Sequence, residues 1–180
     1  LAAGTNTATI SNTETITGTA SADTLTLENI QTGTAIDLAA GTDALNLAAG
    51  TNSATVSNTE TVTGNTGADT VTLGTVLTTG NTVDLAAGTD ALNLAAGTNT
   101  ATISNTETIT GTASADTLTL ENIQTGTAID LAAGTDALNL AAGTNSVTVS
   151  NTETVTGNTG ADTVTLATTV SGATIDLAAG

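Results

Sequence analysis

A six-residue phrase, LAAGTN, recurs along the chain and constrains its fold more than any other feature. It begins at Leu1, Leu47, Leu94 and Leu140, in steps of 46, 47 and 46 residues. Residues 1–52 and 94–145 are identical, so the sequence also repeats over 93 residues. Self-similarity at such periods is typical of solenoids, propellers and arrays. We therefore expect one array over residues 1–180, cut from a longer chain, with four units: 1–46, 47–93, 94–139 and 140–180.

Within each unit, apolar and polar residues alternate in short runs. Examples are Ala44-Leu-Asn-Leu47, Thr70-Val-Thr-Leu73 and Thr82-Val-Asp-Leu85, separated by small or turn-forming residues. Runs of this length with a period of two and many β-branched residues predict strands. No apolar stripe with a period of 3.6 persists, so we expect no helix longer than one turn.

The spacing of the runs favours a β-roll. Their first apolar residues, from Leu45 to Leu92, are separated by 9, 8, 9, 12 and 9 residues. Such spacing suits a parallel, right-handed β-solenoid with two sheets and about 18 residues per coil. Each unit would contain five strands, an odd number, so successive units would start on opposite sheets. The alternative is a three-sided β-helix, in which residues 75–77 form a sixth strand.

Alternation also predicts which side chains face the core. We expect burial of the aliphatic residues at the inward positions and exposure of Asn46 and Thr72 between them. The residues expected inside are Leu45, Leu47, Val56, Val71, Leu73, Val83 and Leu85. A slip of one residue would invert this pattern.

The composition excludes several classes of function. The chain has no Lys, Arg or His and a net charge of -17, so it cannot neutralise nucleic-acid phosphates. It has no Cys, which excludes disulfides and thiol chemistry. No apolar run approaches the length that inserts into a membrane. Every carboxylate context recurs, so no unique catalytic site or small-molecule substrate is indicated, and we expect no enzyme.

The acidic turns resemble the nonapeptide repeats of repeats-in-toxin (RTX) proteins, G-G-x-G-x-D-x-U-x, where U is a large aliphatic residue. The nearest matches are Gly64-Asn-Thr-Gly67-Ala-Asp69-Thr-Val71-Thr72 and its counterpart at residues 157–165. Around Asp43, Leu38-Ala-Ala-Gly41-Thr-Asp43-Ala-Leu45-Asn46 keeps the second-half Gly, the Asp and the aliphatic residue. The paired glycines are incomplete, and Asn52 and Asn99 replace Asp in alternate turns. The flanking phrases are similar to those of secreted bacterial adhesins and surface-layer proteins.

The resemblance implies calcium bound between successive turns. Calcium takes six to eight oxygen ligands, which carboxylates and turn carbonyls supply. The implied ligands are the turn aspartates: Asp23, Asp43, Asp69, Asp90, Asp116, Asp136 and Asp162. The alternative is that these residues only shape the turns, because Asp hydrogen-bonds its own backbone well.

Half-coil counting places these acids in stacks. Asp69, Asp90 and Glu107 should share one edge of the solenoid, and Asp116, Asp136 and Glu153 another. Because coils are about 4.8 Å apart, either cations separate the carboxylates or the side chains turn into solvent. A second group of acids lies between apolar residues and should face outward from strands: Asp37, Asp84, Asp130 and Asp176.

Together these features predict a structural role. We expect an extracellular segment of a bacterial surface protein that forms a filament, stalk or surface layer. Its partners would be copies of itself or flanking repeats, stacked end to end through unpaired coil edges. The alternatives are a Thr-rich ice-binding solenoid and an amyloid-like matrix fibre. The ice-binding alternative is weakened by outward residues that run Asn46, Thr55, Thr72, Asp84 rather than Thr alone.

Overall fold

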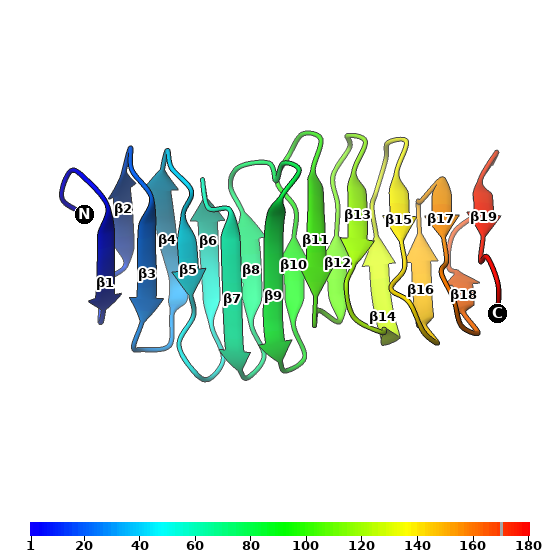
Figure 1. Ribbon diagram of the computed structural model, residues 1–180, viewed down its shortest axis with the longest axis horizontal. Coiled ribbons are helices and arrows are strands. Elements are labelled where there is room, and N and C mark those ends of the chain that lie inside the picture. Colours follow the sequence, from blue (N-terminus) through cyan, green and yellow to red (C-terminus); the bar gives the residue numbers. More distant parts are fainter. Residues whose placement is uncertain (170) are drawn as a thin grey trace.

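The computed structural model describes residues 1–169 and 171–180, and it shows an all-β solenoid (Figure 1). Within the described residues, every regular element is a strand, and no helix is long and apolar enough to cross a membrane. The strands are β1 (Asn6–Ile10), β2 (Thr15–Thr19), β3 (Asp23–Leu27), β4 (Thr32–Ala39), β5 (Ala44–Asn46), β6 (Ser53–Ser57), β7 (Thr61–Thr66), β8 (Thr70–Leu73), β9 (Asn81–Ala87), β10 (Ala91–Asn93), β11 (Thr100–Ser104), β12 (Thr108–Thr110), β13 (Thr117–Leu120), β14 (Thr125–Asp130), β15 (Ala137–Asn139), β16 (Ser146–Ser150), β17 (Thr154–Thr156), β18 (Thr163–Leu166) and β19 (Thr174–Asp176).

The strands form two sheets, and the chain alternates between them. Sheet A contains the ten odd-numbered strands, β1 to β19, and sheet B contains the nine even-numbered strands, β2 to β18. All neighbouring pairs within a sheet are parallel, for example β5 with β7 and β6 with β8. The predicted two-sheet roll is therefore confirmed. The three-sided alternative is wrong: residues 75–77 form no strand but lie in the loop between β8 and β9, where the side chain of Leu77 is buried.

Equivalent strands of successive units lie on opposite sheets, as the odd strand count predicts. The phrase ALN forms β5 in sheet A, β10 in sheet B and β15 in sheet A again. One coil takes 17, 20 or 21 residues: Asn6 pairs with Asp23, Thr24 with Ala44, and Thr61 with Thr82. Because each unit crosses the solenoid five times, only the 93-residue period returns a phrase to the same sheet.

The space between the sheets is filled by aliphatic side chains from both. They form one continuous cluster that contains all seven residues predicted to be inside, each no more than 5% exposed. Thr72 is exposed as predicted, but the prediction for Asn46 is wrong, because this residue is only half-exposed. Its side chain lies between the outward residues of two neighbouring coils, Thr26 and Thr63, and donates to Thr26 Oγ1 at 3.3 Å.

Alanine takes a left-handed φ at or near the ends of β4, β9, β14 and β19. Ala39, Ala86, Ala132 and Ala178 have φ between 56° and 69°. In each case the Asp two residues earlier accepts the alanine N–H, as Asp84 Oδ1 does from Ala86 at 3.0 Å. This Asp turn offsets the cost of a left-handed alanine, about 1 kcal/mol, and reverses the chain toward the opposite sheet.

Candidate functional sites at the two edges of the solenoid

The acidic residues gather where the chain enters each sheet. We call the turns that lead into sheet A edge A, at the top of Figure 1, and the turns that lead into sheet B edge B, at the bottom. At almost every entry, the first residue of the strand or the one before it is Asn, Asp or Glu. Those linked from coil to coil by side-chain hydrogen bonds are, on edge A, Asn6, Asp23, Asp43, Glu60, Asn99, Asp116, Asp136 and Glu153, and on edge B, Asn52, Asp69, Asp90, Glu107, Asn145 and Asp162. Asn81 on edge A and Glu14 on edge B also stand at strand entries but lie outside these two series. We call these two series the edge ladders.

Each ladder is built from quartets in the order Asn, Asp, Asp, Glu. Complete quartets begin at Asn6, Asn52 and Asn99, and Asn145 and Asp162 form the first two members of a fourth series; successive series lie on alternate edges. The predicted stacks are confirmed, since Asp69, Asp90 and Glu107 share edge B. On edge A, Asp116, Asp136 and Glu153 form the matching stack.

Neighbouring quartet members are joined by a hydrogen bond from backbone to side chain. The Asp69 N–H donates to Asp90 Oδ1 at 2.7 Å, and the Asp90 N–H donates to Glu107 Oε2 at 2.7 Å. The same bonds join Asp116 to Asp136, at 2.7 Å, and Asp136 to Glu153, at 2.8 Å. Each carboxylate therefore accepts a hydrogen bond from the backbone N–H of the acid in the preceding coil. This N–H lies between the carboxylates of the two neighbouring acids.

The Asn that begins each quartet makes a denser set of bonds. Asn52 donates both its N–H and its Nδ2 to Asp69 Oδ1, at 2.9 Å each. Its Nδ2 also donates to the carbonyls of Ala48 and Gly50 in its own turn, at 2.8 and 2.9 Å. Asn99 repeats all four bonds with Asp116, Ala95 and Gly97. The side chain of Asn thus binds the carbonyls of its own turn and the first Asp of the ladder together.

The ladder aspartates are buried, so their side chains do not turn into solvent, which was one of the two arrangements expected for stacked carboxylates. Asp23, Asp43, Asp69, Asp90, Asp116 and Asp136 are each 0–1% exposed, and Asp162 is half-buried. The turn backbone holds them inward. A Cβ built on Gly88 would lie 2.1 Å from the Gly67 carbonyl oxygen and 2.7 Å from Asp90 Oδ1, so only glycine fits between the neighbouring backbone and the carboxylate. The second oxygen, Oδ2, has no hydrogen-bond partner within the described structure in Asp43, Asp69, Asp90, Asp116, Asp136 and Asp162.

Two groups of ladder aspartates have pKa shifts in opposite directions. Hydrogen bonds from the preceding Asn lower the pKa of the first Asp, in Asp23 and Asp162. The second Asp receives one N–H and no Asn side chain. Burial therefore raises its pKa, in Asp43 and Asp136 and, in Asp90, to about 6. The charges of the acids on both sides, Asp69 and Glu107 for Asp90, act in the same direction.

The carboxylates of the ladders follow one another from coil to coil along each edge. In the part of the chain that the structure describes, no group of three or more His, Cys, Asp or Glu side chains is placed to hold a metal ion. The candidate ligands are divided between two edges, and at least one oxygen of each accepts a backbone N–H. In the Asn turns, the carbonyls of Ala48 and Gly50 are bound by Asn52 Nδ2. The six Oδ2 atoms without partners are the feature that suits a cation, and calcium binding stays a prediction.

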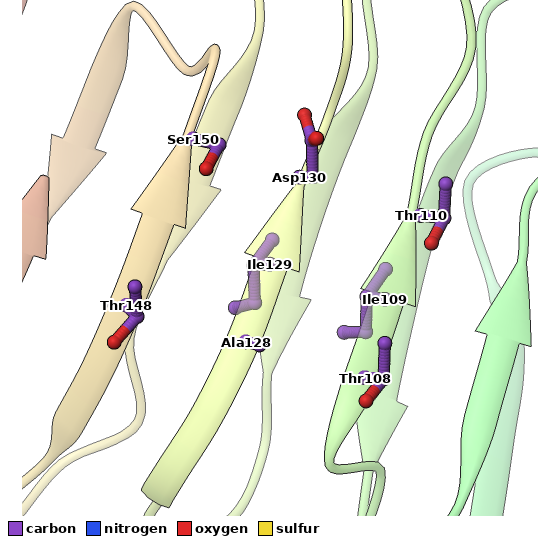
Figure 2. Close-up of a pocket in the computed structure, with 8 residues that line it drawn as sticks. All are labelled: Thr108, Ile109, Thr110, Ala128, Ile129, Asp130, Thr148 and Ser150. Atoms are coloured by element: carbon purple, nitrogen blue, oxygen red, sulfur yellow. The ribbon is translucent and has the colours of Figure 1, made fainter. Parts of the chain in front are cut away.

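The outer faces of the sheets hold the second group of acids. Asp37, Asp130 and Asp176 are exposed as predicted, whereas Asp84 is half-buried. Asp130 borders a shallow trough of about 100 Å³ on sheet B, across β12, β14 and β16 (Figure 2). The small Ala128 leaves this trough between Thr108 and Thr148. Asp130 Oδ1 accepts hydrogen bonds from Asn151 Nδ2 in the next coil and from the N–H of Ala132 in its own turn. This carboxylate therefore links two neighbouring coils on the outer surface.

Comparisons with protein families, with curated proteins and with solved structures find no match for this chain. The resemblance to RTX repeats therefore remains one of sequence pattern. Asn6, Asn52, Asn99 and Asn145 were not predicted as site residues, although a signal was present. LAAGTN and LAAGTD align without a gap, which places these Asn residues where Asp43, Asp90 and Asp136 stand in other turns.

Proposed function

We propose that this chain is a structural rod, a segment of an extracellular filament, stalk or surface layer. Its coils would continue end to end into flanking repeats or further copies. The observation that supports this most is the continuous core: one aliphatic cluster runs from Ile16 to Val155 beneath two sheets that include every described strand. A long core between two parallel sheets resists bending, and its elements contact mainly their neighbours along the axis.

The surface chemistry also supports a rod that stays separate from its neighbours. The chain carries 17 acidic groups and no Lys or Arg. Parallel rods would therefore repel each other, and charged side chains on a sheet face oppose association between sheets. The absence of Lys and Arg also removes the cleavage sites of trypsin-like proteases, which suits exposure outside a cell.

The two alternative functions gain less support. An ice-binding face needs a regular column of Thr, but one outward column of sheet B reads Thr15, Ala35, Thr55, Thr72, Asn93, Thr110, Asp130, Ser150. An amyloid-like fibre stacks identical segments of many chains, whereas here one chain supplies successive, different coils. We therefore retain the rod.

The rod proposal is tested by joining two copies of the chain in register. Inside the array, residues 42–46 (TDALN) connect one LAAG phrase to the next, so two copies joined through TDALN would continue both sheets. The second copy and linker add ten coils, or about 48 Å at 4.8 Å per coil. We expect small-angle X-ray scattering to show a maximum dimension that increases by roughly this length, with the cross-section unchanged.

The matched control is the same fusion with the linker DALN, one residue shorter. This linker shifts the register of the second copy by one residue and places its aliphatic side chains on the wrong face. We expect a bent or partly unfolded particle. If the TDALN fusion also scatters as two flexibly linked bodies, the coils do not continue across the junction and the rod proposal is wrong.

A further inference from the structure

We propose that the edge ladders hold the solenoid together without a metal ion. In this proposal the buried carboxylates act as hydrogen-bond acceptors that extend each sheet by one rung beyond the end of its backbone ladder. The proposal departs from what the resemblance to RTX repeats implies, and it assigns the role that calcium would have to the ladder side chains themselves.

Two kinds of hydrogen bond join neighbouring coils at the edges, one to a backbone carbonyl and the next to a carboxylate. The Ala91 N–H donates to the Asp69 carbonyl at 2.8 Å, a normal parallel β-bond. The Asp69 N–H lies just before the start of β8, beyond the last backbone bond of the ladder. It donates instead to Asp90 Oδ1, at 2.7 Å. The carboxylate of Asp90 therefore stands where a backbone carbonyl would continue the ladder if the chain did not turn. Because a buried N–H without an acceptor costs about 1–3 kcal/mol, this contact stabilises the pairing of the two coils that it joins.

The neutral members of the ladders, the Asn residues, also accept backbone N–H groups. Asn52 Oδ1 accepts the Gln31 N–H at 2.9 Å, and Asn145 Oδ1 accepts the Gln124 N–H at 3.0 Å. Asn99 Oδ1 accepts the Leu77 N–H at 3.1 Å. These Asn residues are as buried as the aspartates and occupy the same rung, but they carry no charge. At these three positions a neutral oxygen acceptor therefore satisfies the N–H of the neighbouring coil, so this bond by itself requires neither a negative charge nor a cation to balance one.

Some carbonyls of the turns already accept hydrogen bonds from Asn side chains. A calcium ion between coils needs carbonyl oxygens as well as carboxylates to reach six ligands or more. In the turns that begin a quartet, Asn Nδ2 already binds two of these carbonyls, those of Ala95 and Gly97 in the Asn99 turn. The Asn side chain therefore takes the position and the ligands that an ion would use.

The proposal is tested by replacing the second Asp of three quartets with Asn. In D43N/D90N/D136N each position keeps an oxygen acceptor and loses the negative charge that a calcium ion would need. We expect the midpoint of thermal unfolding, in excess chelator, to equal or exceed that of the parent protein. In D43A/D90A/D136A, which removes the acceptor, the midpoint should fall by roughly 5–15 °C. The control D37N/D84N/D130N removes the same charge from the outer faces.

Calcium titration separates the two roles of the ladders. We expect midpoints of the parent and of D43N/D90N/D136N that change by less than about 2 °C between excess chelator and millimolar calcium. The proposal is overturned if calcium raises the parent midpoint well beyond this while D43N/D90N/D136N loses the gain and D37N/D84N/D130N keeps it.

Hydrogen exchange tests the same contacts in the unmodified chain, so the proposal does not depend on a variant that folds. In excess chelator, the N–H groups of Asp69 and Asp116 should exchange as slowly as those in the centres of the strands. Fast exchange at these two amides, with slow exchange in the strands, would show that the carboxylates do not cap them and would overturn the proposal.

Discussion

Among the ladder residues, the second Asp of each quartet has the least support from its surroundings. Asp90 accepts a single N–H, its Oδ2 has no partner within the described structure, and acidic residues lie on both neighbouring coils. Asp43 and Asp136 share this environment. These three buried residues accordingly have raised pKa values, and their ionisation opposes folding at neutral pH.

The direction of the pH dependence follows from these shifts. A carboxyl group with a folded pKa above its ordinary value of 3.8 binds its proton more tightly in the folded state. Its contribution to stability is therefore complete below about pH 4 and is lost as pH rises through the folded pKa, about 6 for Asp90. Asp23 and Asp162 act in the opposite sense: their contribution is lost only as pH falls below 3.8.

We therefore expect the unfolding midpoint to be several degrees higher at pH 4.5 than at pH 7.5. Circular dichroism melts across this range measure the difference. D43N/D90N/D136N should flatten the profile, and D37N/D84N/D130N should leave it unchanged. A parent midpoint that rises steadily from pH 4.5 to 7.5 would contradict the assignment of raised pKa values to these three residues.

At the scale of single strands, the elements are short, and each depends on one or two inward side chains. β10 has three residues, and its central Leu92 is fully buried between β8 and β12. Replacing Leu92 with Ala should lower the free energy of unfolding by about 2–5 kcal/mol, because the neighbouring coils cannot close the cavity without shifting their own strands. Urea denaturation measures this loss.

The matched control for Leu92 is Thr72→Ala, on the exposed face of the neighbouring strand β8. Thr72 Oγ1 accepts only a surface bond from Asn93 Nδ2, at 3.2 Å, so its loss should cost less than about 1 kcal/mol. Equal losses for the two variants would show that the inward and outward assignments are wrong.

Strands and turns differ in how far the sequence predicts them. Alternation predicts the inward face of a strand because its period of two fixes where each side chain points, as at Leu45 and Val71. A turn has no such period. Ala86 takes a left-handed φ of 65°, and the carboxylate of Asp90 then turns inward against Gly88. The stacks at each edge were therefore predicted, but their burial and their bonds to backbone N–H groups were not.

For the whole molecule, the odd number of strands per unit has a consequence for how the array can change length. Removing residues 47–93 joins Asn46 to Leu94, which restores the Asn-Leu-Ala-Ala-Gly phrase found at residues 46–50. Every later strand then moves to the other sheet. Glu107 takes the place of Glu60 beside Asp43, and Asn99 takes the place of Asn52 beside Gln31. Both ladders are rebuilt, because residues 94–139 supply the same types of ladder residue in the same order as residues 47–93: Asn, Glu, Asp and Asp.

We therefore expect the deletion of residues 47–93 to give a folded, shorter rod. It should keep the β-type circular dichroism per residue and an unfolding midpoint within a few degrees of the parent, since interactions in such arrays are local. Its length in small-angle scattering should decrease by about 12 Å, for two and a half coils at 4.8 Å. Deleting residues 47–94, one residue more, shifts the register and should abolish cooperative unfolding, because the aliphatic residues of the later strands would face solvent. If both deletions fold equally well, the parity of strands and the register of the ladders do not control the fold.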